Sequence, residues 1–245
     1  MIKKILILLF LLLIIVYLVV AVTAFNTKPS DQVCKGMELT IKDSIDHGFI
    51  SKKEVFRLLN SKKLSPVGKK ISAINTRLLE EELSQHPLIE NVECYRTSGC
   101  KIGIEVTQRL PILRVMANNG DNYYIDHKGK IMPIPNSSAH VVVITGNVNR
   151  DFAIKELYKL GVFLQDHPLW NAQIEQINVT QTKELELVPR VGEHIIFLGK
   201  PGNYEEKFER LKTFYEKGLN QIGWNKYSRI SLEFNNQIIC TKKEK

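Results

Sequence analysis

The sequence has few cysteines and none of the spacings that bind a metal ion. There is no C-x-x-C pair, no histidine at zinc-ligand spacing from a cysteine, and no H-E-x-x-H motif among the six histidines. The four cysteines are Cys34, Cys94, Cys100 and Cys240. We therefore expect no metal site and no cofactor.

Catalytic motifs are also missing. Gly199-Lys200-Pro201 lacks the spacing and the following Ser or Thr of a phosphate-binding loop. Ser98 and Lys101 form the S-x-x-K pattern of penicillin-binding enzymes, but K-T-G is absent and the serine falls at a predicted hairpin turn. Asp126-His127 fits a turn in which the aspartate bonds its own backbone better than an acid–base pair. We expect no enzymatic activity and no small-molecule substrate.

Proline is scarce as well. The 245 residues include only 9 prolines, no internal repeat and no low-complexity tract before the lysine-rich end, while 44% are hydrophobic and 24% are charged. This composition excludes a largely disordered chain. The length leaves room for a membrane anchor and two folded domains.

Charge is absent from one long apolar run, residues 5–25. About 20 apolar helical residues span a hydrocarbon core of about 30 Å. Lys3 and Lys4 precede the run, which favours a cytoplasmic tail at residues 1–4, a transmembrane helix at 5–25 and an extracytoplasmic bulk. The alternative is a cleaved signal peptide, because Val22-Thr23-Ala24 supplies small residues for cleavage. The run exceeds the roughly 7–15 residues of a usual signal-peptide core, which favours retention.

The formal net charge is +8, and much of the excess lies in one stretch, residues 52–70. Its basic residues are Lys52, Lys53, Arg57, Lys62, Lys63, Lys69 and Lys70, against Glu54 alone. Two interpretations remain open: a surface for anionic lipids or an acidic partner, or a solvated helix face with a lysine-rich loop. Nucleic acid is not expected as a partner, because no aromatic interleaving supports it.

The pattern of residues 37–110 predicts a small α+β domain. Met37, Leu39 and Ile41 alternate with polar residues, as in a half-buried strand. Ser51-Lys52-Lys53-Glu54 fits a capping box at the start of a first helix, and a second helix begins near Asn75 and ends before Pro87. Strands at 89–96 and 101–109 complete a β-α-α-β-β order.

Residues 111–245 predict a mixed, β-rich domain with two helices, 154–164 and 204–221. The expected strands lie at 123–125, 130–132, 141–144, 173–180, 184–190, 193–199, 229–234 and 237–242. With residues 26–36 as a polar spacer, the fold class is α+β: an N-terminal transmembrane helix, a small three-stranded domain and a β-rich domain.

Four local segments carry a family resemblance. They are Ile50-Ser51 leading into Glu54-Val55, His86–Val92, Ile104–Pro111 and Tyr124–Ile131. With the order of parts, they resemble the FtsQ/DivIB family of bacterial cell-division proteins, in which a POTRA domain and a mostly β domain follow one membrane helix. The last three resemble that family's "P-W-V-x-x-A-x-V", "I-x-V-x-E-R-x-P" and "L-I-D-x-x-G-x-V".

The chain departs from the family pattern at three places. Gln108 stands where Glu is usual, Leu88-Ile89 where Trp-Val is common, and Asp46-His47-Gly48 where the family has Gly-Asn after the first strand. The resemblance implies a divisome scaffold of the bacterial inner (plasma) membrane, at the division site. It also implies partners of the FtsB and FtsL type, small coiled-coil membrane proteins, and a link to control of septal peptidoglycan synthesis.

The resemblance places partner docking at the last strand. The implied docking residues are Phe234, Asn235, Asn236, Gln237, Ile238 and Ile239. The residues themselves predict a two-residue turn at Asn235-Asn236, because asparagine tolerates positive φ. Phe234 then lies opposite Gln237, and Leu232 opposite Ile239.

In that register the core face consists of Ile230, Leu232, Phe234 and Ile239, whereas Ile238 and Cys240 are apolar residues on an otherwise polar face. Such a pair needs a cover. The cover is either an added partner strand or a loop or helix of the same domain.

A second hairpin raises the question of a disulfide. If its turn is centred on Thr97, Cys94 lies opposite Cys100 with both side chains toward the core. The two cysteines then form either a disulfide or a pair of small buried thiols.

Two other functions remain possible from the sequence. A POTRA-bearing protein of polypeptide transport requires a β-barrel or repeated POTRA units, and neither is found in this sequence. A secreted hydrolase requires titratable residues that converge in a pocket.

Overall fold

The computed structural model describes residues 2–25, 32–42, 48–135 and 137–244, and its contacts group them into two compact units. The first helix, α1 (Ile2–Phe25), is the one described helix that is long and apolar enough to cross a membrane. Among its described side chains, Leu12 is 61% exposed and Tyr17 is 71% exposed. A continuous apolar surface of this size requires a nonpolar surrounding.

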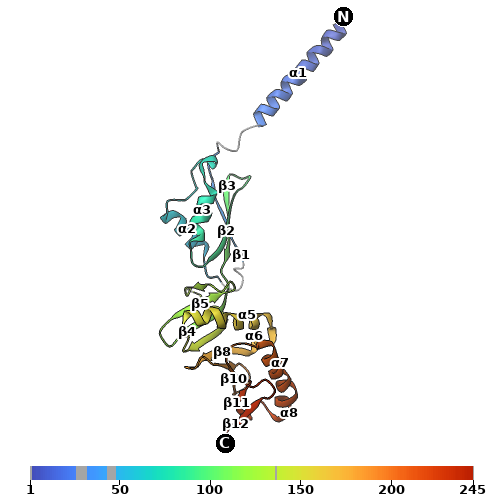
Figure 1. Ribbon diagram of the computed structural model, residues 1–245. Coiled ribbons are helices and arrows are strands. Elements are labelled where there is room, and N and C mark those ends of the chain that lie inside the picture. Colours follow the sequence, from blue (N-terminus) through green and yellow to red (C-terminus); the bar gives the residue numbers. More distant parts are fainter. Residues whose placement is uncertain (1, 26–31, 43–47, 136, 245) are drawn as a thin grey trace. The chain divides into compact units, whose positions relative to one another are not determined.

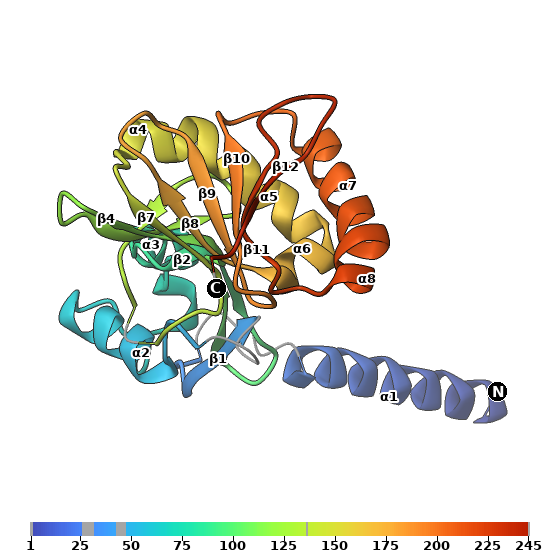
Figure 2. The same ribbon diagram turned by 90° about the horizontal axis from the view of Figure 1, so that it is seen from below.

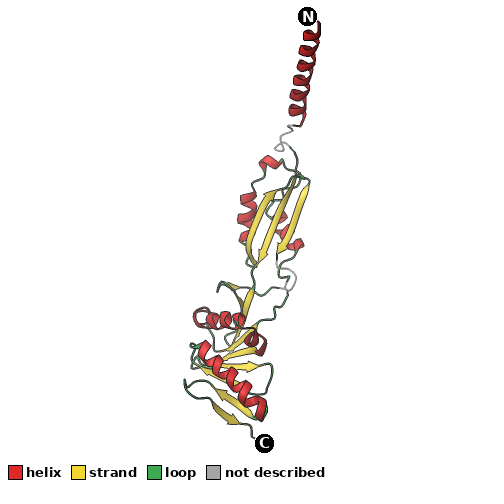
Figure 3. Ribbon diagram, turned by 90° about the vertical axis from the view of Figure 1, so that its right-hand side faces the viewer, coloured by secondary structure: helices red, strands yellow, loops and turns green. Residues whose placement is uncertain are grey.

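The first unit contains a three-stranded sheet in the order β1-β3-β2. Its strands are drawn in yellow in Figure 3. The strands are β1 (Gly36–Lys42), β2 (Ile89–Arg96) and β3 (Lys101–Gln108); the helices are α2 (Lys52–Ser61), the 3-10 turn η2 (Ile71–Ala73) and α3 (Thr76–Ser84). This is the predicted β-α-α-β-β order. Val55 and Leu59 on α2, and Leu79 and Leu83 on α3, are buried at i, i+4 spacing. Alternate residues of β3 supply the facing side of the core.

The described part of the expected spacer is packed against the first unit. Val33 forms an antiparallel bridge with Lys70, and the Cys34 amide donates to the Lys69 carbonyl at 2.8 Å. Cys34 is only 1% exposed. The predicted polar spacer at residues 26–36 therefore does not extend to residue 36, because its described part belongs to the first unit. Residues 26–31 lie outside the described part of the chain.

The second unit is built on a nine-stranded mixed sheet in the order β12-β11-β10-β9-β8-β7-β4-β5-β6 (Figure 1). The strands are β4 (Pro111–Ala117), β5 (Asn122–Asp126), β6 (Ile131–Met132), β7 (Val142–Gly146), β8 (Ile174–Val179), β9 (Leu185–Pro189), β10 (Ile195–Gly199), β11 (Tyr227–Ser231) and β12 (Ile239–Lys242). Strand β7 pairs in parallel with both β4 and β8, and β10 pairs in parallel with β11. The fold is mixed α+β, as predicted.

Helices cover one face of this sheet (Figure 2). One helix runs through α4 (Arg150–Phe152), η3 (Ala153–Leu157) and α5 (Tyr158–Asp166); α6 (Pro168–Gln173) follows; and a last helix runs through α7 (Tyr204–Phe214), η4 (Tyr215–Leu219) and α8 (Asn220–Ile222). Leu160, Phe208 and Leu211 are buried among alternate strand residues such as Ile144 and Leu187. The residues between these strand positions, such as Thr145 and Glu186, face away from the helices.

Two elements of the second unit were absent from the sequence-based prediction. Strand β4 begins at Pro111, the residue that marked the expected domain boundary, and it pairs on both sides, with β5 and β7. Helix α6 begins at Pro168, which was expected only to end a helix. A proline in the first helical turn loses no intrahelical hydrogen bond, so it also starts helices.

Candidate functional site

The last strand, β12, lies at one end of the nine-strand order. It pairs antiparallel with β11, with Ser231 opposite Ile239 and Ile230 opposite Cys240. Beyond β12 no further strand is present among the described residues of this sheet. Its second side is therefore an edge of the kind that accepts another strand.

The hairpin register differs by one residue from the predicted one. The predicted register set Leu232 opposite Ile239 and required a two-residue turn at Asn235-Asn236; instead residues 232–238 form a longer connection. The Leu232 amide donates to the Phe197 carbonyl of β10 at 2.8 Å, and the Arg210 guanidinium donates to the carbonyls of Leu232 and Phe234. These bonds hold residues 232–234 against β10 and α7. This segment therefore does not continue the pairing of β11 with β12.

The shift reverses which apolar residues face outward. Phe234 and Ile239, expected in the core, are each 46% exposed. Ile238 and Cys240, expected on the outer face, are partly buried and pack against the core. Of the predicted docking residues, Phe234 to Gln237 are exposed in the connection, and Ile239 opens β12.

A cavity of about 530 Å³ lies beside this connection. Its walls come from α7 and η4 on one side, including Arg210 and Phe214, and from Asn236, Gln237 and Ile238 on the other. The cavity therefore borders the connection that leads into β12.

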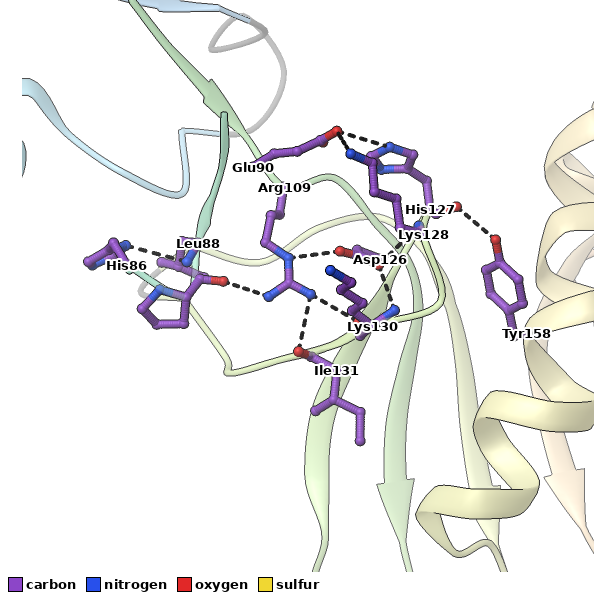
Figure 4. Close-up of polar contacts among 11 residues, drawn as sticks. His86, Leu88, Glu90, Arg109, Asp126, His127, Lys128, Lys130, Ile131 and Tyr158 are labelled. Atoms are coloured by element: carbon purple, nitrogen blue, oxygen red, sulfur yellow. Dashed lines mark hydrogen bonds and ion pairs between the residues drawn. The ribbon is translucent and has the colours of Figure 1, made fainter. Parts of the chain in front are cut away.

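A second cluster within the same unit joins the segments that carry the family resemblance (Figure 4). Arg109 Nε lies 2.7 Å from Asp126 Oδ2, and these side chains are only 12% and 2% exposed. The other Asp126 oxygen accepts the amides of Lys128 and Lys130 at 3.0 and 2.7 Å. Asp126 is thus the partner of a buried cation and the centre of the turn, not a free acid or base.

Arg109 uses its remaining donors on backbone carbonyls. It donates to Pro87 at 2.9 Å, to Lys130 at 3.2 Å and to Ile131 at 3.1 Å, and its own amide donates to Leu88 at 3.0 Å. The Arg109 guanidinium therefore joins three segments by hydrogen bonds. They are the chain before β2, the chain that leads into β4, on which Arg109 lies, and the β5–β6 hairpin.

Gln108, the departure from the family pattern, is fully buried beside this cluster. Its Oε1 accepts the amides of Phe49 and Ile50 at 2.9 and 3.0 Å. A carboxylate offers the same acceptor oxygen, so glutamine preserves the two hydrogen bonds without a buried charge. Residues 46 and 47, where the family has Gly-Asn, lie outside the described part of the chain.

The expected pairing of Cys94 with Cys100 rests on a wrong register. The Thr97 amide donates to the Lys101 carbonyl at 2.9 Å, so the turn occupies Thr97 to Cys100, with Cys100 at φ 58°. Both cysteines are free thiols in this structure. Burial and the nearby Glu80 carboxylate raise the pKa of Cys94 to about 12, which leaves it a protonated, poor nucleophile.

His194 is a buried titratable residue of the second unit. It is 1% exposed, and its Nε2 lies 2.8 Å from the Tyr215 hydroxyl. Burial lowers the pKa of His194 below its ordinary value, which a backbone hydrogen bond at Trp224 opposes in part.

We expect the protein to lose stability in mild acid because of His194. The unfolded chain binds a proton near the ordinary histidine pKa of about 6.5, whereas the folded state binds it only at lower pH. The contribution of His194 to the free energy of unfolding is therefore fully present above about pH 6.5. It is lost as the pH decreases through the pKa that His194 has in the folded protein. Between pH 7.5 and pH 5.0, the Tm of His194→Gln should fall less than the Tm of the parent, because the variant lacks the buried histidine. The other histidines titrate in both proteins and so do not contribute to the difference. Equal slopes would assign the acid sensitivity to other groups.

Comparison with known families gives two matches. The model of "POTRA-like domain" matches residues 32–107, and that of "FtsQ/DivIB, C-terminal related" matches residues 110–241, more than half of the chain. No curated protein matches the chain. With a POTRA-like domain, a related C-terminal domain and an apolar N-terminal helix, the chain belongs to the FtsQ/DivIB family and has a role in cell division.

Proposed function

We propose that this protein is a non-enzymatic scaffold of the division site that binds FtsB- and FtsL-type membrane proteins through the edge of β12. It links these partners to the control of septal peptidoglycan synthesis. The observation that carries the proposal is a β12 edge without a neighbouring described strand, in a domain of the FtsQ/DivIB type.

The exposed residues of β12 support strand addition as the mode of binding. Ile239 and Thr241 are exposed, whereas Cys240 between them packs toward the core. A partner strand beside β12 forms backbone hydrogen bonds along the edge and sets its side chains against Ile239 and Thr241. Phe234 adds a second exposed apolar group in the adjoining connection.

The proposed topology follows from charge and hydropathy. Helix α1 spans the inner (plasma) membrane once, Lys3 and Lys4 keep the N-terminus in the cytoplasm, and both domains lie outside. We keep 111–245 as the proposed extent of the second domain and extend the first, predicted at 37–110, back to the described residue 32. The membrane anchor then places the docking edge beside partners that are themselves anchored, which raises their effective concentration.

Localisation in the native host tests this function. A fluorescent protein fused to the N-terminus should gather at mid-cell in dividing cells, because the domains bind division proteins there. A matched fusion that carries only residues 1–36 should spread along the whole envelope. Uniform envelope fluorescence of the full-length fusion would contradict the proposal.

A further inference from the structure

The corrected hairpin register brings Cys100 beside a different cysteine. The Lys35 amide donates to the Cys100 carbonyl at 2.9 Å, so Cys34, the residue before Lys35, lies next to the β2–β3 turn. Both side chains are buried, at 1% exposure for Cys34 and 9% for Cys100. Both residues belong to the first unit.

This hydrogen bond limits the separation of the two cysteines. The Cys34 α-carbon is two covalent bonds from the Lys35 nitrogen, and the Cys100 α-carbon is two bonds from its own carbonyl oxygen. The two α-carbons are therefore at most about 7.7 Å apart, and every bend in this path shortens the distance. Disulfides usually join α-carbons about 4.4–6.8 Å apart.

The Cys100 side chain also lies against the segment that contains Cys34. In the extended segment bridged to Lys70, Val33 is 51% exposed, whereas Cys34 points inward. The Cys100 sulfur contacts the side-chain oxygen of Gln32, two residues before Cys34, so it lies against the segment that contains Cys34.

We propose that Cys34 and Cys100 are a modification site and form a disulfide in the mature protein. Both are free thiols in this structure. The proposal rests on the extracytoplasmic placement given above, because disulfides persist in oxidising compartments.

The oxidant is a protein disulfide of a thiol–disulfide oxidoreductase. Cys100 lines a cavity of about 460 Å³ together with Gln32 and Arg96, so it is the more accessible of the two thiols. Its thiolate attacks one sulfur of the oxidant's disulfide, which gives a mixed disulfide and frees one oxidant thiolate. The Cys34 thiolate then attacks the Cys100 sulfur and expels the second oxidant thiolate. Two electrons pass to the oxidant, and the two protons released by the cysteines balance those its thiolates take up.

The bond closes a chain segment that includes α2, α3 and β2. Such a cross-link stabilises mainly by restricting the unfolded chain, and more so for long loops. It also fastens the segment that follows the anchor to the β2–β3 turn. We expect the Tm of the oxidised protein to exceed that of the reduced protein by about 5 °C or more.

The test uses the full chain in detergent micelles. The variant Cys94→Ala/Cys240→Ala retains only the proposed pair, and Cys34→Ala/Cys240→Ala retains Cys94 and Cys100 as a matched control. Each is equilibrated in a glutathione redox buffer, denatured in sodium dodecyl sulfate so that buried thiols become accessible, and treated with a maleimide–polyethylene glycol. The additions to each chain are counted on a gel. The first variant should take up none before reduction and two after it; the control should take up two throughout.

Two additions to the first variant without reduction would overturn the proposal, as would a disulfide in the control. Counting the additions to the first variant in acid-quenched cells of the native host tests the cysteine pairing separately from the extracytoplasmic placement. No addition before reduction supports both the pairing and the placement. A bond that forms in micelles but not in cells supports the Cys34–Cys100 pairing and contradicts the extracytoplasmic placement instead.

Discussion

Replacement of Asp126 by alanine should lower the free energy of unfolding of the second unit by about 3–5 kcal/mol, because it leaves the Arg109 guanidinium buried without its anion. The change also removes the acceptor of the Lys128 and Lys130 amides. In a domain of this size the loss corresponds to a Tm lower by about 10 °C or more. Thermal unfolding of the full chain in micelles, followed by near-ultraviolet circular dichroism, measures it.

Asp151→Ala is the matched control. Asp151 forms an ion pair with Lys155 at 3.0 Å, but these side chains are 72% and 67% exposed. Solvent screens such a pair, so its loss should cost less than about 1 kcal/mol. If Asp126→Ala melts within 2 °C of Asp151→Ala, the Arg109–Asp126 pair does not hold the motif segments together.

The substitution Ile239→Lys should weaken the capture of FtsB- and FtsL-type partners at least about tenfold while the chain remains folded. Ile239 is 46% exposed, so lysine costs little in the free protein. In a complex with an added strand, the ammonium group is desolvated beside apolar side chains of the partner. Co-purification from native membranes, followed by a Kd with the purified partner, gives the ratio.

Leu169→Lys makes the same chemical change at a similarly exposed site. Leu169 is 53% exposed and lies on α6, outside the β12 edge and its connection. This control should bind like the parent. The docking site lies elsewhere if Ile239→Lys melts like the parent and also binds like it.

Most helices and strands follow from local patterns in the sequence. The apolar run of α1, the i, i+4 spacing of α2 and α3, and the alternation along β3 each depend on neighbours a few residues apart. Strand β4 and helix α6 were missed because a proline marks the start of each, and proline suits an element's first position as well as a boundary.

The sequence by itself therefore determined the apolar N-terminal helix, the order of the domains and the family motifs. Only the tertiary structure decided how distant residues meet. Arg109 and Asp126 lie 17 positions apart, yet a single ion pair joins their motifs. The register of β11 and β12 depends on Phe197 and Arg210, outside the hairpin, and Cys100 lies beside Cys34 instead of opposite Cys94. Local periodicity sets which face of an element is apolar, but register is set by hydrogen bonds to other elements, and a shift of one residue exchanges the two faces.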